Sequence, residues 1–474
     1  MRSLSGLSFP LLSTVLLQIV SPTPSWEELD RRPVPTWYTD AKFGIFLHWG
    51  VFSVPSFGNE WFQKYWQGER RSNYMDFVNA TEGPGFAYTQ YASRFRAELY
   101  HPEAWSRAFA DAGAQYVVLT SKHHEGFCMW DSSDVPSTWQ WNVMDVGPRR
   151  DLLGGLAHAV PRTTSPMTNR TLHFGVYHSL FEWFNPLYLQ DKARNFTTSS
   201  FVDSKSLAEL YDLVRKYKPT LIWSDGFDRG DSAYWKAREF LQWYSTESPV
   251  ASEAVWNDRW GTDTFCKHGS FLTCDDNYDP GQPMSRYYEN CLQMDRSSWG
   301  YNRNATLNDY STTTDLVHAL VTAVAQNGNL LLNIGPGSDG RLPTIFLDRL
   351  RGIGEWLQVN GESIYGTSAW SVCSKESSDG TDIYYTVKGG TLYAHVTKWP
   401  EQQNVVLRCT HHISTPTKVT MLGVDDESLR WKLNDRGHIE IQMPTLTPDR
   451  VPCQHSWVVV LKGVIQSKHP TSTK

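Results

Sequence analysis

Apolar runs that stop abruptly at polar residues recur along the first three quarters of the chain. One covers residues 116–120 and leads into Ser121-Lys122-His123-His124, and another covers residues 221–223 and leads into Ser224-Asp225-Gly226. Similar runs occupy residues 43–50, 174–179, 250–261 and 329–336. Short apolar runs of this kind are typical of buried strands in parallel sheets whose two faces are covered.

Helical patterns separate these runs. Residues 206–218 carry apolar side chains at helical spacing, and Lys218-Pro219 ends that helix directly before the next strand. Further helices are predicted near residues 100–113, 314–326 and 345–358, and Asp151 is placed to cap another. The alternation over about residues 35–360 predicts a parallel sheet, and the number of repeats favours a closed (β/α)8-like barrel of the TIM type.

The pattern changes near residue 368, where short alternating runs replace the helices. These runs cover residues 383–387, 391–395, 404–407, 418–422, 438–443 and 456–461. They predict a C-terminal antiparallel β-sandwich. A chain of 474 residues also exceeds what one small core usually organises, so we expect a barrel over residues 26–365 and a β-sandwich domain over residues 366–474.

Composition restricts the function only a little. Aromatic residues make up 14% of the chain, with 21 Trp, and such rings stack on sugars in carbohydrate sites but also fill ordinary cores. The formal net charge of -6 is mild and evenly spread. This balance argues against a nucleic-acid or polyanion partner.

The first residues predict a secreted protein. Arg2 precedes an apolar stretch that runs to Val20 and is followed by residues 21–25, which is the pattern of a signal peptide at residues 1–25. That stretch is too short to span a bilayer, and no later segment is long enough. In the secretory route, four Asn-X-Thr sequons are candidate glycosylation sites: Asn79, Asn169, Asn195 and Asn304.

Seven cysteines in an oxidising compartment leave at least one without an intramolecular partner. Cys266 and Cys274 are close enough to close a small loop, and Cys409 with Cys453 is predicted to staple the C-terminal domain. Cys128, next to a polar motif, is the candidate free thiol. The chain has no Cys-X-X-Cys pair, so neither a zinc nor a redox site is indicated.

Asp225 is the first candidate for a catalytic group. It stands before Gly226 at the carboxyl end of a predicted strand, which is where barrels carry their reactive side chains. A single Asp in such a place is more often a helix N-cap or a turn residue. The catalytic interpretation therefore requires other strand ends to bring reactive groups to the same place.

Other predicted strand ends do carry such groups: His48, the pair His123 and His124, Tyr177, and Arg259. A lone histidine is usually packed in a core, and adjacent histidines point apart on a strand, which disfavours a metal site. Imidazoles that bind substrate hydroxyls are the preferred interpretation. An arginine here can donate to two vicinal hydroxyls or to a carboxylate, although a surface ion pair is the ordinary alternative.

Taken together, these segments resemble a known family. FGIFLHWG with GNEWF, SKHHEGF, WNVMDVGP, FGVYHS, LIWSDG, NDRWG and NLLLNIGP resemble the α-L-fucosidase family in its animal lysosomal and secreted branch. The resemblance covers nearly the whole chain from Trp37 to the closing β domain. Several motifs in the same order make it far more specific than any one of them.

The resemblance implies a retaining exo-glycosidase that releases terminal L-fucose from the glycans of glycoproteins and glycolipids, without a metal or an organic cofactor. It also implies a place in the lysosome or outside the cell, and often a homotetramer. By motif, Asp225 matches the nucleophile. The implied fucose-binding set is His48, Glu60, Trp61, His123, His124, Tyr177, Trp223 and Arg259, with Trp299 as a less certain platform.

The acid/base residue is less fixed in this family, and the sequence leaves a choice. Asp276 is favoured because it follows the loop between Cys266 and Cys274, which is able to hold a short acid over the site. Glu289 is the second candidate and Asp275 the third. Any of them is also explained as a solvated loop acid. The variable residues after Gly226 leave the leaving-group preference open.

Two other functions fit the same residues. A catalytically inactive fucose-binding lectin would keep the pocket, but the acids at all candidate positions are present, which argues against it. A metal-dependent hydrolase would use His48, His123 and His124 with an acid. Activity on a chromogenic fucoside, measured with and without a chelator, separates the three hypotheses.

Overall fold

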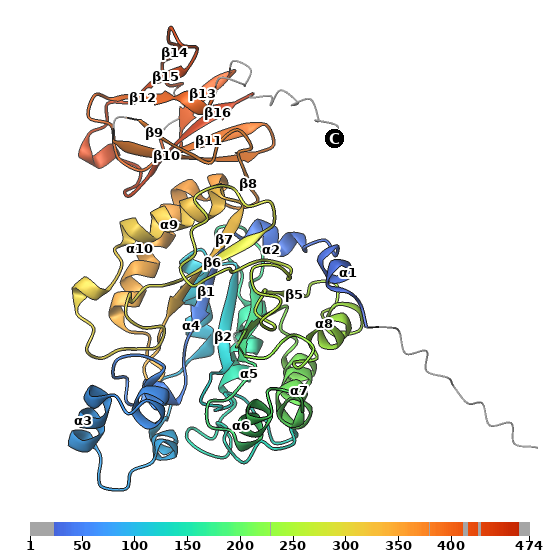
Figure 1. Cartoon of the computed structure of the whole chain (residues 1–474). Coiled ribbons are helices and arrows are strands. Elements are labelled where there is room, and N and C mark those ends of the chain that lie inside the picture. Colours follow the sequence, from blue (N-terminus) through green and yellow to red (C-terminus); the bar gives the residue numbers. More distant parts are fainter. Residues whose placement is uncertain (1–22, 228, 379, 411–415, 425–427, 464–474) are drawn as a thin grey trace, which may run out of the picture.

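The structure, a computed structural model, describes residues 23–227, 229–378, 380–410, 416–424 and 428–463. A parallel sheet surrounded by helices forms the larger part, and antiparallel strands form a second unit at one end of it (Figure 1). The predicted signal peptide lies almost entirely outside the described residues. Within these ranges no helix has the length and apolar character needed to cross a membrane.

Among the described residues the larger sheet has seven strands, all parallel, in the order β5-β4-β3-β2-β1-β7-β6. The strands are β1 (Phe43–Leu47), β2 (Tyr116–Lys122), β3 (His173–Ser179), β4 (Leu221–Asp225), β5 (Val255–Trp256), β6 (Tyr288–Gln293) and β7 (Gly328–Ile334). The register places Tyr177 beside Trp223 and Ser179 beside Asp225. Neighbouring strands therefore deliver their carboxyl ends to one face.

A short segment closes the gap between the two edges of this sheet. The Ser270 backbone N–H donates to the Trp256 carbonyl (2.9 Å) beside β5, and Leu272 forms a parallel bridge with Tyr288 on β6. Residues 270–273 thus occupy the place of an eighth strand, which confirms the (β/α)8-like barrel. The apolar pattern does not predict β6, because polar residues such as Glu289 interrupt it.

Helices cover the outside of the barrel. They are α1 (Trp26–Asp30), α2 (Thr36–Ala41), α3 (Ser72–Thr81), α4 (Pro102–Asp111), α5 (Leu152–Ala159), α6 (Pro186–Ala193), α7 (Leu207–Tyr217), α8 (Ala237–Thr246), α9 (Thr313–Ala325) and α10 (Thr344–Asn360). Two π-helical turns are η2 (Lys64–Gly68) and η5 (Val202–Ser206). Short 3-10 turns are η1 (Val51–Ser53), η3 (Tyr88–Arg94), η4 (Val160–Arg162), η6 (Leu307–Asp309), η7 (Gly361–Ser363), η8 (Arg408–Thr410) and η9 (Pro448–Arg450).

Local chemistry explains where the predicted helices begin and end. Asp151 caps α5 because its carboxylate accepts from the Gly154 backbone N–H at 2.8 Å. Lys218 adopts a left-handed conformation (φ 52°) at the end of α7, and Pro219 cannot continue a helix. The chain then enters β4 at Leu221, so the helix end fixes the start of the strand that carries Asp225.

The C-terminal unit is antiparallel, as predicted. Its strands are β8 (Ser368–Ala369), β9 (Lys375–Ser378), β10 (Thr381–Lys388), β11 (Thr391–Val396), β12 (Asn404–Leu407), β13 (Lys418–Met421), β14 (Trp431–Leu433), β15 (Ile439–Gln442) and β16 (Trp457–Lys462). One sheet has the order β13-β16-β11-β10-β8, with β9 also paired to β10, and the other has the order β12-β15-β14. Side chains of both sheets, such as Tyr385, Val405 and Ile441, share one buried cluster.

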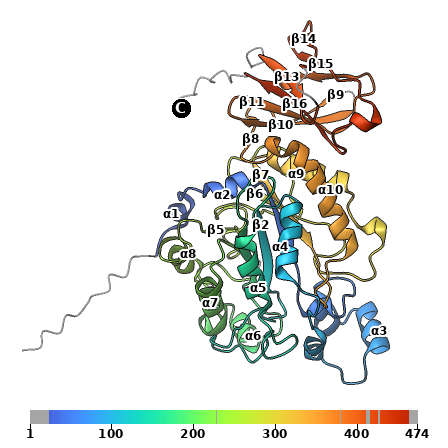
Figure 2. The same ribbon diagram turned by 180° about the vertical axis from the view of Figure 1, so that it is seen from behind.

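This unit packs on α9 and α10, away from α3 and α6, in both views (Figures 1 and 2). The Trp356 indole N–H on α10 donates to the Ser456 carbonyl at 2.8 Å. Tyr393 and Val458 of the β strands belong to the same buried cluster as the barrel. The two units therefore share apolar contacts as well as a hydrogen bond.

The structure confirms one predicted disulfide and corrects the other. Cys266 is bonded to Cys274 as expected, but Cys409 is bonded to Cys373 and not to Cys453. The reason is the packing of β9 next to β12: the Arg408 backbone N–H donates to the Glu376 carboxylate (2.9 Å), which brings Cys373 to Cys409. All seven cysteines lie in the described residues, and Cys128 is unbonded as predicted, together with Cys291 and Cys453.

Candidate active site

A cavity of about 240 Å³ lies where the strand ends of the barrel meet. It is lined by twelve of the thirteen residues that the sequence singles out: His48, Glu60, Trp61, His123, His124, Tyr177, Trp223, Asp225, Arg259, Asp275, Asp276 and Trp299. Glu289 is the one that does not line it. Residues more than two hundred positions apart thus converge on one sugar-sized hollow.

Asp225 ends β4 with its side chain directed into the cavity, and only 18% of that side chain is exposed. Its Oδ2 accepts a hydrogen bond from the Tyr177 hydroxyl (2.8 Å) and lies 3.5 Å from His124 Nε2. Its Oδ1 accepts from the Gly226 backbone N–H (3.0 Å) and lies 3.6 Å from Arg259 Nη1. Both carboxylate oxygens are therefore oriented by donors.

Burial raises the pKa of Asp225 above its usual value, and the negative charge of Asp276 adds to this. Arg259, the Tyr177 hydroxyl and the Gly226 N–H act in the opposite direction, because each stabilises the ionised carboxylate. A partly desolvated carboxylate held by such donors is a stronger nucleophile than one in bulk water, provided that it stays ionised.

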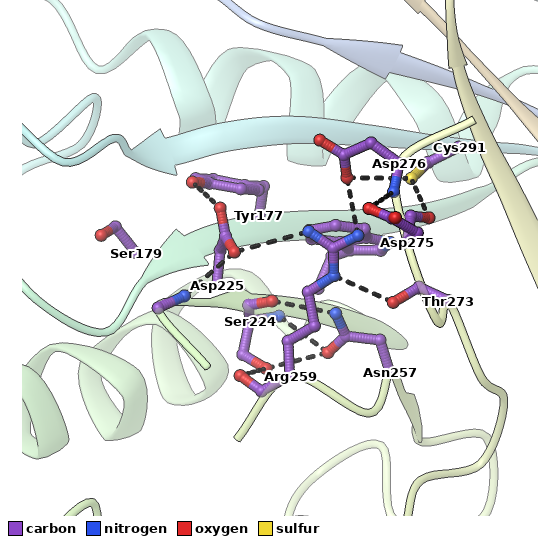
Figure 3. A network of polar contacts seen from close by, with 12 residues as sticks. Tyr177, Ser179, Ser224, Asp225, Asn257, Arg259, Thr273, Asp275, Asp276 and Cys291 are labelled. Atoms are coloured by element: carbon purple, nitrogen blue, oxygen red, sulfur yellow. Dashed lines mark hydrogen bonds and ion pairs between the residues drawn. The ribbon is translucent and has the colours of Figure 1, made fainter. Parts of the chain in front are cut away.

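Arg259 links the two acids of the site (Figure 3). Its Nη2 donates to Asp276 Oδ1 at 2.6 Å while its Nη1 faces Asp225, and its Nε donates to the Thr273 hydroxyl at 2.9 Å. The guanidinium carbon lies 4.5 Å from the centre of the Trp223 ring. Asp276 thereby stands close to Asp225, although its own side chain is 43% exposed.

The loop that carries Asp276 is held in place by hydrogen bonds to Asp258, a buried residue that sequence reasoning did not single out. Asp258 Oδ1 accepts from the Thr273 backbone N–H (3.0 Å) and hydroxyl (2.6 Å). Its Oδ2 accepts from the backbone N–H groups of Cys266 (2.9 Å) and Cys274 (3.2 Å). The available signal was its place beside Arg259 in the NDRWG stretch.

Two of the three histidines of the site are held by neutral polar side chains. His48 Nδ1 lies 2.7 Å from the Asn333 side-chain oxygen, and His124 Nδ1 lies 2.6 Å from the Ser179 hydroxyl. Burial lowers the pKa of His48 to about 3 and lowers that of His124 well below its usual value. Near neutral pH these two imidazoles are uncharged, which suits hydrogen bonding to sugar hydroxyls.

Glu60 and two tryptophans, Trp61 and Trp299, also line the cavity. The Glu60 Oε2 accepts from the backbone N–H groups of Trp299 (2.9 Å) and Gly300 (3.2 Å), and burial raises its pKa. Glu60 therefore fixes the loop that places the Trp299 ring. Trp61 is half-buried, with its ring centre 5.8 Å from that of His124.

Glu289 lies inside the barrel on β6 and is fully buried. Its carboxyl accepts from the Tyr38 (2.9 Å) and Tyr116 (2.5 Å) hydroxyls and from the Trp223 indole N–H (3.1 Å). Burial raises its pKa to about 7, although these three donors oppose the rise. The residue has the proton affinity of a general acid but lies behind Trp223, outside the cavity lining.

Besides Gly226, which contributes only backbone, sequence reasoning missed six lining residues: Phe46, Lys64, Phe181, Trp183, Phe227 and Arg229. Phe181 and Trp183 directly follow β3, so their position after a strand end was the available signal. Within the described part of the chain, no group of three or more His, Cys, Asp or Glu side chains is arranged to hold a metal ion.

Two family models match the chain. The α-L-fucosidase model matches residues 15–362, and the α-L-fucosidase C-terminal domain model matches residues 376–462. An α-L-fucosidase of Branchiostoma floridae is 47% identical over 93% of this chain and 96% of that protein. The tissue α-L-fucosidase of Homo sapiens is 45% identical over 93% of this chain and 92% of that protein.

Solved structures agree with this. The α-fucosidase of Thermotoga maritima in complex with fucose superimposes with a TM-score of 0.78 at 31% identity, over 93% of this chain and 99% of that one. Since the models cover both structural units and relatives of high identity span nearly the full length, the chain belongs to the α-L-fucosidase family, whose enzymes hydrolyse α-L-fucosyl linkages.

Proposed function

We propose that this enzyme releases terminal α-L-fucose from glycans by a retaining, two-step mechanism with Asp225 as the nucleophile. The observation that carries the proposal is that Asp225 and Asp276 meet on one guanidinium inside a sugar-sized cavity. Retaining glycosidases need two carboxyl groups about 5 to 5.5 Å apart, one to attack and one to exchange a proton.

In the first step an Asp225 oxygen attacks the anomeric carbon, and the bond from that carbon to the acceptor oxygen breaks. Asp276 gives its proton to the departing oxygen, which leaves a fucosyl ester on Asp225. In the second step Asp276 takes a proton from water, the water oxygen bonds to the anomeric carbon, and the Asp225 carboxylate departs. Two inversions give net retention.

Asp276 is preferred over Glu289 and Asp275 for the proton transfer on grounds of position. It lines the cavity, contacts Arg259 and has an exposed side chain that is free to turn from the guanidinium toward a leaving oxygen. Glu289 is better suited by proton affinity, but a general acid must reach the atom that it protonates. Asp275 lines the cavity without a bond to Arg259.

The proposed fucose contacts follow from the same geometry. His48, His123, His124 and Glu60 offer hydrogen-bonding groups for hydroxyls, while Trp61, Trp223 and Trp299 offer apolar faces for the ring and its methyl group. Tyr177 and Arg259 orient Asp225. The lectin alternative has no observation in its favour.

The test is Asp225→Ala with an aryl α-L-fucoside, with and without sodium azide. We expect turnover to fall by several orders of magnitude and azide to restore part of it, because azide enters the space of the lost carboxylate. The rescued product should be the inverted fucosyl azide. Asp435→Ala, an exposed acid of the β domain, is the matched control and should keep wild-type turnover. Near wild-type turnover of Asp225→Ala would sink the nucleophile assignment.

We further propose a lysosomal or secreted enzyme that acts on glycoproteins and glycolipids. Relatives include tissue and plasma α-L-fucosidases of mammals. The sequon residues Asn79, Asn169, Asn195 and Asn304 are all exposed, as glycan attachment requires. Mass spectrometry before and after glycan removal tests the sequons, and light scattering tests the proposed homotetramer.

A further inference from the structure

A second hollow of about 240 Å³ adjoins the active-site cavity. The two spaces share Lys64, Phe181, Trp183 and Arg229 in their linings, so they lie next to each other. A cavity that holds a terminal sugar must open toward the rest of the glycan. The second hollow provides adjoining space of the size of one more sugar.

Its walls come from the turn η2 with Glu69, from the chain that follows β3 and continues into α6, and from Arg229 after β4. Lys64 Nζ lies 4.6 Å from the Trp61 ring centre and 5.9 Å from that of Trp183. A Cβ atom on Gly68 would lie only 3.3 Å from the Phe184 ring. Phe184 is 41% exposed, so the face of its ring is accessible to a ligand in the hollow.

The charge of this hollow differs from that of the whole chain. Among the described residues its charged lining consists of Lys64, Lys192, Arg229 and Glu69, whereas the whole chain carries -6. Glu69 accepts from Arg71 outside the hollow, at 2.7 Å, and lies 4.0 Å from Lys64 within it. Its negative charge is therefore already compensated, and the basic side chains dominate.

We propose that this hollow binds the acceptor sugar next to fucose and favours acceptors that carry a carboxylate or a sulfate group. In this proposal the aromatic side chains Trp183 and Phe184 contact the sugar. The anionic group is attracted by Lys192, together with Lys64 and Arg229. This inference rests on the proposed function and adds a substrate class to it.

The experiment compares three fucosylated oligosaccharides that are identical except that one is neutral, one carries a sialic acid and one a sulfate ester on the acceptor. We expect the kcat/KM of the wild type to be about threefold to tenfold higher for an anionic substrate, because exposed ion pairs are individually weak. The preference should shrink at about 1 M salt, where charges are screened within about 3 Å.

Lys192→Gln should remove most of this preference while hydrolysis of the neutral substrate is kept. Arg194→Gln is the matched control, because it removes the same charge from the end of α6 outside the hollow. Equal kcat/KM for all three substrates, or a preference that survives in Lys192→Gln, would overturn the inference. Failure to release fucose even from the neutral substrate would instead count against the proposed function itself. Whichever anionic substrate shows the higher kcat/KM, the sialylated or the sulfated one, identifies the group that the hollow prefers.

Discussion

At the scale of single residues, the two main acid/base candidates differ both in position and in proton affinity. Glu289 has the raised pKa that a general acid needs, about 7, but three donors hold it behind Trp223. Asp276 lies on the cavity wall beside Asp225's partner, Arg259. A carboxyl group that cannot reach the glycosidic oxygen has no use for a suitable pKa.

Asp276→Ala and Glu289→Gln should therefore respond differently to the leaving group. For Asp276→Ala we expect kcat/KM to fall about 100-fold to 10,000-fold with a fucosyl sugar, and much less with a dinitrophenyl fucoside, which needs no proton. For Glu289→Gln the two substrates should be affected equally. Steady-state kinetics with both substrates on both variants checks this, and the reverse pattern would make Glu289 the acid.

Glu289 should instead make stability depend on pH. Its pKa is raised from 4.5 to about 7 by burial, so between these values the folded state keeps a proton that the unfolded state has lost. Its contribution to the free energy of unfolding is then complete below pH 4.5 and declines as the pH rises to about 7. The size is about 3 kcal/mol, since one pKa unit corresponds to about 1.4 kcal/mol.

Denaturation of the wild type and of Glu289→Gln at several pH values from 4 to 8 measures this contribution. The difference in free energy of unfolding between wild type and variant should change by about 3 kcal/mol between pH 4.5 and about 7. From there to pH 8 it should stay level. Glu401→Gln, whose side chain is 87% exposed, serves as the control and should follow the wild type. Parallel curves for Glu289→Gln and the wild type would contradict the expectation.

Individual site residues were predictable where they end an apolar run. Asp225, His123 and Tyr177 are such cases, because the carboxyl ends of parallel strands meet on one face. The position of Glu289 was not predictable, because it lies within a strand that its own polarity conceals in the apolar pattern. It is the second residue of β6, so it lies near the amino end of the strand, whereas the cavity lies at the carboxyl ends.

At the scale of elements, the loop from Cys266 to Asp276 determines how the acid/base candidate is presented. The disulfide between Cys266 and Cys274 closes it, and Asp258 accepts four hydrogen bonds from it. Residues 270–273 also take the place of the eighth strand. One element thus closes the barrel and carries part of the site.

Asp258→Ala should consequently impair both stability and chemistry. It leaves buried backbone N–H groups of Cys266, Thr273 and Cys274 without their acceptor, at a cost of roughly 1–3 kcal/mol for each unsatisfied group. We expect kcat/KM to fall more for a fucosyl sugar than for a dinitrophenyl fucoside, because Asp276 loses its support. Asp258→Asn keeps one acceptor oxygen, so its stability and activity should lie between those of the wild type and those of Asp258→Ala.

Chemical denaturation and the ratio of the two kcat/KM values measure these effects. A variant that is destabilised but keeps the wild-type ratio would show that Asp258 only supports the fold. Sequence patterns revealed the disulfide but not the buried carboxylate beneath it. Nothing in a short polar stretch tells which of its acids turns inward to accept backbone donors, because that depends on the tertiary packing.

At the scale of the whole molecule, the division into a barrel and an antiparallel β unit was predictable, because the period of the apolar pattern changes from helical to alternating. How the two units dock was not. The faces of α9 and α10 that meet the β unit look like any amphipathic helix face, and the partner strands lie far along the chain. The missed pairing of Cys373 with Cys409 also depends on tertiary packing, because it requires β9 to lie next to β12.

The shared apolar core predicts that the two units stabilise each other. Trp356 is 1% exposed and donates to the Ser456 carbonyl, so Trp356→Ala removes a large ring and leaves an acceptor without its donor. We expect the free energy of unfolding to fall by about 3–5 kcal/mol. The barrel and the β unit should then unfold together at a lower denaturation midpoint. Trp139→Ala, at a Trp that is 55% exposed, should change little. If the β unit unfolded earlier while the barrel kept its midpoint, the docking surface would contribute nothing to the stability of the catalytic unit.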